Sequence, residues 1–321
     1  MEGEKTMAKN FRKPDALTVK GKLAGFGTSL FRYVLLILIS FIILFPFISK
    51  ISASFMSIED MYDRTVNFIP RKPTLDNYKT VMDAMKYWPT ALRTLLLSLV
   101  CAIPQTFVSA FTGYALAKSK TKAGKIGMGM VLITILIPPQ VIMLPMYLKF
   151  RFFDVLGLVE ATTGSSINLL SAAGGFLPFI ILSCTGMAFK NGIYIYLLRQ
   201  FYKGMPEELE EAAYLDGCNP FKTFFKIILP NSGSMMVTVF MLSFAWQWTD
   251  TFYTSLFLKS DTVLSTSIFA LSGIATEGSG DFYLTVIIYT AVILAILPLV
   301  IMYLFGQKKL IAGIERSGMT G

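Results

Sequence analysis

The sequence predicts an all-α, polytopic membrane protein with six transmembrane helices, and three observations lead to that fold class. Hydrophobic residues make up 54% of the 321 residues, which exceeds the roughly 45–50% of ordinary soluble domains. Several apolar stretches reach the length of about 20 residues that a helix needs to cross the hydrocarbon core of a bilayer. Lysine and arginine cluster in the short segments between these stretches, as in proteins whose loops set their orientation in a membrane.

Six apolar stretches have the length of a membrane span, and their approximate bounds are 30–49, 91–117, 126–148, 176–198, 234–258 and 283–305. The first is followed by Ser52-Ala53-Ser54, which weakly resembles the cleavage site of a signal peptide. The polar arm before it, residues 1–29, is long for such a signal. We therefore expect an uncleaved signal anchor and one membrane domain over residues 30–305.

The fourth span is the least regular, because the chain is apolar from 167 to 202 but is interrupted by Lys190-Asn191-Gly192. Two crossings would need about 40 residues plus a turn, so one crossing preceded by a partly buried external segment is the better interpretation. Lys190 then lies in the outer half of the membrane or at its outer surface. Its amine is expected either to snorkel to the interface, which is the simpler interpretation, or to contact a transported solute.

Cations in the short loops predict the direction of the spans, since they mark the cytoplasmic side. The arm 1–29, the loops after spans two and four, and the tail 306–321 are all basic. They carry Lys5, Lys9, Arg12, Lys13, Lys20 and Lys22; then Lys118, Lys120, Lys122 and Lys125; then Arg199, Lys203, Lys222 and Lys226; and finally Lys308, Lys309 and Arg316. Both ends of the chain are therefore expected in the cytoplasm. The loop 50–88 carries charges of both signs, but its length of about 40 residues weakens the rule there.

Prolines inside spans two and three indicate bent helices. They are Pro104, Pro138, Pro139 and Pro145. Each removes a backbone donor and bends a helix unless its neighbours compensate. The bends either surround a cavity, as in transporters, or only help the helices to pack.

Asp250 is the only acid well inside a predicted span, and it is expected near the outer face, close to Trp246 and Trp248. A polar residue at the rim of the membrane is the simpler interpretation, and a proton relay is the alternative. We take Lys190, Trp248 and Asp250 as candidates for the solute path.

Composition argues against several other classes of protein. The chain has no histidine and only three widely spaced cysteines without a CxxC pair, so neither a metal site nor a disulfide framework is expected. No catalytic residues are expected, because no nucleophile with a base and no cluster of acids is apparent. The net charge of +9 would suit nucleic acid, but the cations flank apolar stretches, so the lipid bilayer is the expected partner.

The loop between spans four and five, residues 199–230, has the pattern of a helix, a turn and a second helix. Pro206 suits a first helical position, and three glutamates follow it near the positive end of the helix. Gly217 can take the left-handed conformation that ends this helix. Asn219 then caps a second helix with Pro220 at its first position. Ala212 and Ala213 leave a flank on which another protein's backbone can approach closely.

This loop resembles the signature of permease subunits of ABC importers, in which Glu-Ala-Ala is followed after three residues by Gly and after nine more by Ile-x-Leu-Pro. The matching residues are Glu211, Ala212, Ala213, Gly217, Ile227, Leu229 and Pro230. By that resemblance, 199–230 is a coupling loop that docks on a separate ATPase. A bare Glu-Ala-Ala triplet would carry no weight, whereas seven matched positions in a loop of the right sidedness do.

Further segments narrow the resemblance to carbohydrate importers, in particular to the second permease of the maltose type. They are Phe45-Pro46-Phe47, 73–78, Gly113 to Lys118, Ile137 to Gln140 with Pro145, Leu198 to Phe201, and the tail 307–321. Two features depart from the family pattern. Trp248-Thr249-Asp250 stands where Trp-Asn-Asp is usual, and the segment between Leu169 and Lys190 is longer than expected.

The resemblance implies an assembly in a prokaryotic plasma membrane, made of two permeases, two ATPase subunits and an external substrate-binding protein that delivers a sugar. The chain has no GxxxxGK[ST] phosphate loop, so ATP and Mg²⁺ are expected on the ATPase partner and no cofactor on this chain. Three alternatives stay open: an ABC importer for a non-sugar solute, a secondary transporter driven by an ion gradient, and an integral membrane enzyme. The last two leave the loop 199–230 unexplained.

Overall fold

The computed structural model describes residues 16–66, 68–154, 160–161, 164–258, 263–271 and 281–318. Within these ranges the regular structure is helical, and the one β-feature is an isolated bridge between Phe153 and Ile167. The chain divides into two compact units, residues 1–73 and 74–321, which are described separately.

The first unit is built around α1 (Ala16–Ser54), a helix of 39 residues that contains Pro46. After it comes α2 (Ile58–Tyr62), whose first turn is capped by the Ser57 side chain. Asp60 lies buried in this unit and accepts a hydrogen bond from the Lys72 backbone N–H at 2.9 Å. The predicted external loop that starts near residue 50 is therefore folded back on itself where Lys72 meets Asp60.

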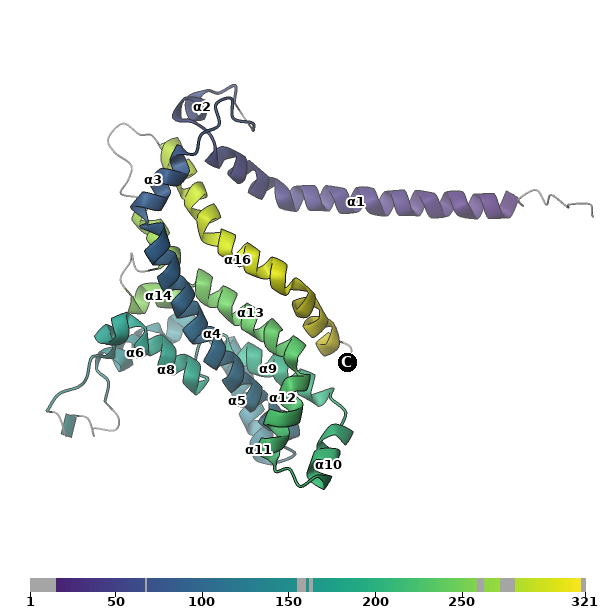
Figure 1. The fold of residues 1–321 in the computed structure, drawn as a ribbon, viewed down its shortest axis with the longest axis vertical. Coiled ribbons are helices and arrows are strands. Elements are labelled where there is room, and N and C mark those ends of the chain that lie inside the picture. Colours follow the sequence, from purple (N-terminus) through teal and green to yellow (C-terminus); the bar gives the residue numbers. More distant parts are fainter. Residues whose placement is uncertain are drawn as a thin grey trace, which may run out of the picture. The chain divides into compact units, whose positions relative to one another are not determined.

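The second unit is organised around α4 (Tyr87–Lys118), which follows α3 (Asp76–Ala84). Figure 1 shows α4 running beside α13 (Gly233–Thr249), which in turn packs against α16 (Asp281–Gly318). Gly113 lets α4 approach α9 (Asn191–Lys203) closely, since a Cβ there would lie 3.1 Å from the Arg199 backbone nitrogen. This close packing makes α4 the central helix of the unit.

The third predicted span, 126–148, is not one helix. It divides into α5 (Lys122–Leu136) and α6 (Pro139–Arg151), which meet at an angle of 100°. Pro138 is held in an extended conformation because the next residue is also proline, and Pro139 then starts α6. The adjacent prolines therefore break the helix more sharply than a simple bend.

The fourth predicted span, 176–198, is also interrupted. A 3₁₀ segment, η1 (Leu169–Gly175), leads into α8 (Leu177–Thr185), which ends at Gly186 with φ of 72°. The chain restarts as α9 at Asn191, so residues 186–190 separate the two helices. A glycine in the left-handed conformation ends a helix. The prediction of one crossing rested on apolar composition, which does not show the conformation of a single glycine, and so it missed this break.

The fifth predicted span, 234–258, ends early. α13 stops at Thr249, and the short helices α14 (Phe252–Phe257) and α15 (Leu264–Ala270) follow it. Before α13 lie α10 (Glu208–Leu215), α11 (Pro220–Thr223), the π-helical η2 (Phe224–Ile228) and α12 (Leu229–Asn231). The segment Pro220–Asn231 meets α13 at 80°.

Within the described ranges, three helical segments are long and apolar enough to cross a membrane: Thr28–Ser54, Tyr87–Lys118 and Phe282–Gly313. Counting each of the two bent pairs, α5 with α6 and 220–231 with α13, as one span raises the number to five. The interrupted α8 and α9 are not among them. The multi-helix membrane architecture thus agrees with the sequence, while the count of six stays a prediction.

Candidate functional site

The turn between α10 and α11 has the geometry that the sequence predicts. Gly217 has φ of 76°, its N–H donates to the Tyr214 carbonyl at 3.0 Å, and the Cys218 N–H donates to the Ala213 carbonyl at 2.9 Å. The Asn219 side chain accepts a hydrogen bond from the Lys222 N–H at 2.9 Å and caps α11, where Pro220 is the first residue. α10 begins at Glu208, slightly later than the start predicted at Pro206.

One face of α10 packs against its own chain. Glu210 and Ala213, three residues apart and so on the same helix face, are both buried, whereas Glu211 and Ala212 are exposed. The expectation of a free flank at both alanines is therefore wrong for Ala213, because a short helix on the surface must bury one face to stay in place. Ala212 and Glu211 remain accessible.

An ion pair ties α10 to the end of the central helix. Lys118 Nζ lies 2.8 Å from Glu210 Oε1, and their side chains are only 26% and 10% exposed. From the sequence, Lys118 is interpreted as a marker of orientation and Glu210 as one of several acids at a helix start. No local spacing indicates the pair, because the two residues lie 92 positions apart in the chain.

The second half of the matched pattern anchors the loop on the helical bundle. Ile227 and Leu229 pack against a buried cluster that includes Tyr202, Phe224 and Ile228. Pro230 is exposed within α12, just before the chain turns into α13. These residues hold the turn in place and leave its tip free.

Large apolar side chains surround this tip. Leu215 is 89% exposed, Phe221 62% and Phe225 55%. A soluble surface seldom leaves such side chains together without a partner. Together with the exposed Glu211, they form a surface suited to contact with another protein.

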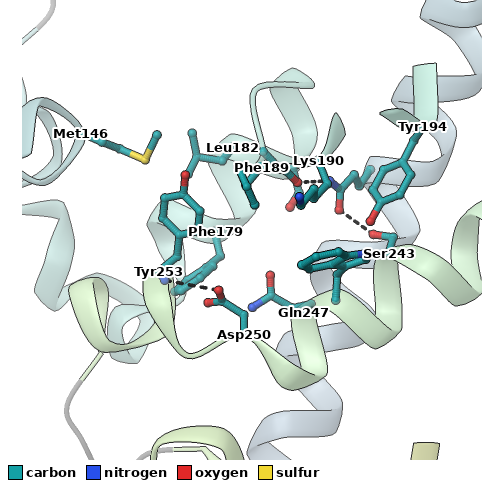
Figure 2. Close-up of a pocket in the computed structure, with 14 residues that line it drawn as sticks. Met146, Phe179, Leu182, Phe189, Lys190, Tyr194, Ser243, Gln247, Asp250 and Tyr253 are labelled. Carbon is teal, nitrogen blue, oxygen red and sulfur yellow. Dashed lines mark hydrogen bonds between the residues drawn. The ribbon is translucent and has the colours of Figure 1, made fainter. Parts of the chain in front are cut away.

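A second site lies among the helices, about 20 Å from Lys118 along α4, since Gln105 at its edge is 13 residues away at 1.5 Å per residue. It is a cavity of about 50 Å³ lined by residues of α4, α6, α8, α9, α13 and α14 and of the break before α9. In Figure 2, Gln247 and Asp250 lie on one side of an open space, and Phe189 and Lys190 lie on the other. A larger cavity of about 300 Å³ shares Ala188, Phe189 and Lys190 with it.

The break between α8 and α9 positions Lys190. Its φ of 69° is in the left-handed region, which residues other than glycine rarely adopt. Three contacts hold this backbone: Gln105 Nε2 donates to the Phe189 carbonyl at 3.2 Å, Asn191 Nδ2 donates to the Gly186 carbonyl at 2.9 Å, and Ser109 Oγ donates to Asn191 Oδ1 at 3.1 Å. The two hydrogen bonds donated from α4 thus hold Phe189 and Asn191, the residues on either side of Lys190.

The Lys190 ammonium lies over two aromatic rings, 4.4 Å from the centroid of Trp246 and 4.6 Å from that of Phe189. Such cation–π contacts are weakly stabilising and leave the N–H donors available. Among the described residues, no carboxylate lies within 4.0 Å of this ammonium. The amine therefore faces the cavity rather than a counter-ion.

Asp250 lies in the break between α13 and α14 rather than inside a helix. One carboxylate oxygen accepts hydrogen bonds from the Thr254 N–H and hydroxyl, both at 2.7 Å, and so caps α14. The Asp250 carbonyl accepts a bond from Ser265 Oγ at 2.7 Å. Its position on the cavity wall agrees better with a polar rim residue than with a relay, since the described donors around it are neutral.

Trp248 does not reach the cavity. It is 4% exposed, stacks on Phe244 and donates its indole N–H to the Ala295 carbonyl of α16 at 2.9 Å. Trp246 lines the cavity instead, because residues two apart on a helix point to different sides. Of the two tryptophans, the sequence singles out Trp248 as a candidate for the solute path, whereas Trp246 is the one that lines this cavity.

Three further polar groups on the wall are not indicated by the sequence. Gln247 Nε2 and the hydroxyls of Tyr194 and Tyr253 are buried and have no hydrogen-bond partner in the described structure. Buried donors without partners are rare in native proteins. Their type alone does not distinguish them from other residues of an apolar span, so only their burial and lack of partners single them out. The described residues contain no group of three His, Cys, Asp or Glu that could hold a metal ion.

Comparison with solved structures relates the fold to ABC importers. A chain of a bacterial ABC transporter involved in the import of the acidic polysaccharide alginate matches with a TM-score of 0.67 and 18% sequence identity, covering 88% of this chain and 95% of that one. A second structure of the alginate transporter, in complex with its pentasaccharide-bound periplasmic protein, matches with a TM-score of 0.63 at 17% identity. It covers 89% of this chain and 94% of the other. At these identities the likeness concerns the fold.

Curated relatives cover nearly the whole chain. The arabinooligosaccharides transport system permease protein AraQ of Halalkalibacterium halodurans is 29% identical over 88% of this chain and 93% of its own length. The probable starch degradation products transport system permease protein AmyC of Thermoanaerobacterium thermosulfurigenes is 28% identical over 87% and 92%. The sn-glycerol-3-phosphate transport system permease protein UgpE of Salmonella typhi is 23% identical over 91% and 97%.

A family model matches residues 105–315, which include α4 from Gln105 onward, both candidate sites and most of α16. That match covers about two thirds of the chain and agrees with its apolar helices and its likeness to importer subunits. The chain belongs to the family of binding-protein-dependent transport system inner membrane components.

Proposed function

We propose that this chain is one of two permease subunits of an ATP-driven importer for a sugar or oligosaccharide in a prokaryotic plasma membrane. It works with an ATPase dimer and an extracytoplasmic binding protein, crosses the membrane six times, and has both termini in the cytoplasm. Membership of the family, together with relatives that carry arabinooligosaccharides and starch degradation products, supports this proposal. ATP and Mg²⁺ act on the partner, and this chain needs no cofactor or metal.

The observation that carries the proposal is the exposed tip around Gly217, held to the helical bundle at both ends. Glu211 and Ala212 are accessible beside Leu215 and Phe221, while Ala213, Ile227 and Leu229 pack on the chain itself. An ATPase subunit that holds this tip can move it as a rigid body. The ion pair between Glu210 and Lys118 gives α4 a direct connection to that movement.

In the proposed mechanism, closure of the ATPase dimer moves the tip and tilts the helices between inward-open and outward-open states. The breaks at Pro138, after Gly186 and at Asp250 provide places where helix segments change their angle. Lys190 and Asp250 line the solute path. Trp248 does not face this path, but it holds α13 against α16.

The experiment is transport by the reconstituted assembly. The chain is co-expressed with its second permease and ATPase, reconstituted in proteoliposomes, and supplied with the binding protein and radiolabelled arabinobiose or maltose. ATP-dependent accumulation is expected, and ATP hydrolysis should rise when the loaded binding protein is present. Uptake driven by a proton or sodium gradient without any ATPase would contradict the proposal.

A second cargo class has one observation in its favour, which is the similarity to a permease for sn-glycerol 3-phosphate. The same proteoliposomes supplied with that labelled phosphate distinguish the two cargoes. Preference for sn-glycerol 3-phosphate over both sugars would replace the sugar assignment and leave the importer assignment intact.

A further inference from the structure

The small cavity between α8, α9, α13 and α14 has the features of a binding site rather than of a packing defect. Its described wall carries one cation, Lys190, and one carboxylate, Asp250, together with unpartnered polar groups of Gln247, Tyr253 and Tyr194. Empty packing defects are apolar. A site with several convergent polar groups beside aromatic rings is instead the common form of a small-molecule site.

We propose that Lys190, Gln247, Asp250 and Tyr253 bind hydroxyl groups of a neutral sugar directly, so that this subunit is itself a binding station on the solute path. This proposal rests on the function proposed above and adds the residues and the solute chemistry. Lys190 and the amide of Gln247 donate hydrogen bonds. Asp250 accepts them, and the Tyr253 hydroxyl does either.

Burial of the unpartnered groups is the first argument. Tyr253 is only 7% exposed, yet its hydroxyl has no partner, and the same holds for Nε2 of Gln247. Leaving a buried polar group unpaired is unfavourable. Both groups line the same cavity, and a hydroxyl-bearing ligand that entered it would pair them.

Charge is the second argument, and it selects a neutral ligand. One cation and one carboxylate face the same space, so the described wall carries no net charge. A vicinal diol suits this arrangement, because one hydroxyl accepts from the ammonium while a neighbour donates to the carboxylate. Asp250 keeps capacity for this, since its second oxygen has only a 3.4 Å contact from the Tyr253 N–H. An anion would gain from Lys190 but be repelled by Asp250.

Size decides how much of the sugar enters. The cavity of about 50 Å³ has room for a few hydroxyl groups, because about 10–15 Å³ of such space is enough for one water molecule. Trp246 lines the cavity and is 49% exposed, so it presents an aromatic surface at the opening. The polar edge of a sugar thus enters the cavity while its ring lies beside Trp246.

The test measures binding and transport separately on the complete assembly. Binding of tritiated arabinobiose and maltose is measured on the purified assembly, without the binding protein, after trapping with vanadate. The informative variants are Tyr253→Phe, which removes only an unpartnered hydroxyl, and Gln247→Met, which removes the unpartnered Nε2 together with Oε1. We expect each to weaken sugar binding about 3- to 10-fold, which corresponds to one neutral hydrogen bond, while thermal stability is unchanged or raised.

Ser98→Ala is the matched control. The Ser98 hydroxyl is also buried and unpartnered, but Ser98 is not among the residues that line the cavity. Its removal should leave binding and uptake unchanged. If Tyr253→Phe and Gln247→Met behave like Ser98→Ala, or if neither sugar binds the wild-type assembly, the cavity holds only water and the proposal is wrong.

Charge variants test the preference for a neutral solute. Lys190→Met should lower binding of the sugars and of sn-glycerol 3-phosphate, whereas Asp250→Asn should raise the binding of the phosphate relative to arabinobiose. Equal changes for both kinds of solute would contradict selection by charge. ATP-dependent sugar uptake that persists in all of these variants would refute the cavity proposal and keep the importer. Sugar binding to the cavity without ATP-dependent uptake would refute the importer proposal and keep the cavity proposal.

Discussion

At the scale of single residues, Gly217 decides the direction of the chain at the exposed tip. Its φ of 76° is a conformation that residues with a Cβ avoid, and no atom lies within 4 Å of the place where a Cβ would be. Substitution therefore meets backbone strain and no steric contact. This separation of effects makes the residue a clean test of the tip's shape.

Gly217→Val should reduce ATP-dependent uptake strongly while membrane insertion and yield stay normal. The left-handed conformation costs about 1–2 kcal/mol for a residue with a Cβ, so the turn relaxes and the tip changes shape. Gly129→Val is the control, because a Cβ there also meets open space but φ is ordinary. The readouts are uptake and yield of the assembled transporter. Full uptake by Gly217→Val would contradict the proposal that Gly217 sets the shape of the tip for coupling.

Several single residues were predictable from sequence, and the reason is local. Gly217, Asn219 and Pro220 act through their own backbone and their nearest neighbours, so their types identify their roles. Gln247 and Tyr253 became visible only in the structure. Their importance comes from the residues that they face across the cavity, such as Lys190, which is more than 50 residues away in the sequence. The spacing of residues within α13 or α14 does not indicate this proximity.

At the scale of secondary-structure elements, the interrupted helices distinguish this fold from a simple bundle. The sequence predicts long spans because hydrophobic composition averages over about 20 residues, whereas a helix ends at one residue. Breaks at Pro138, Gly186 and Asp250 each interrupt a predicted span. The prolines were recognisable as bends, although the chain breaks more sharply there, but Gly186 is one of 24 glycines and its carbonyl is held by the Asn191 side chain.

Asn191 should be essential to the break between α8 and α9. It is 2% exposed and bonds both the Gly186 carbonyl and Ser109. Asn191→Ala leaves these buried groups unpaired, and each such group costs about 1–3 kcal/mol. We expect a clear fall in the thermal unfolding temperature of the purified assembly, together with loss of sugar binding.

Asn231→Ala serves as the comparison, because Asn231 also bonds a carbonyl, that of Ile227, but is exposed. Its substitution should change stability by no more than about 0.5 kcal/mol. Equal destabilisation by the two variants would argue against a special role for the break.

The connection between α4 and α10 gives a further prediction. Glu210→Gln removes the charge partner of the partly buried Lys118, so stability of the assembly should fall by about 1–3 kcal/mol, and uptake per ATP hydrolysed should fall as well. Asp76→Asn is the control, since the pair of Asp76 with Lys79 is 3.9 Å apart and about four-fifths exposed on both sides. A double substitution that exchanges the charges of Lys118 and Glu210 should recover part of the coupling.

Unchanged coupling in Glu210→Gln would show that α4 does not need this ion pair to follow the tip. Measuring uptake and ATP hydrolysis in the same vesicles separates this outcome from a loss of assembly. A variant that only weakens assembly lowers both quantities in proportion.

At the scale of the whole molecule, the positions of the two sites suit the proposed coupling of ATP hydrolysis to solute movement. The exposed tip around Gly217 lies at one end of α4, and the polar cavity lies beside Gln105, nearer the middle of the same helix. α4 packs on α8, α9 and α13, all of which contribute to the cavity wall. We therefore expect a displacement at Lys118 to reach the cavity through contiguous, closely packed helices.

The central claim is that the tip docks on the ATPase, and site-specific photo-crosslinking tests it most directly. A photoreactive phenylalanine is placed at Leu215, which is 89% exposed at the tip, and at Trp88, which is 72% exposed near the opposite end of α4. Irradiation of the co-expressed assembly should give an adduct with the ATPase subunit from position 215 and none from position 88. Absence of that adduct from position 215 in an assembly that contains the ATPase, or an equal adduct from position 88, would contradict the account.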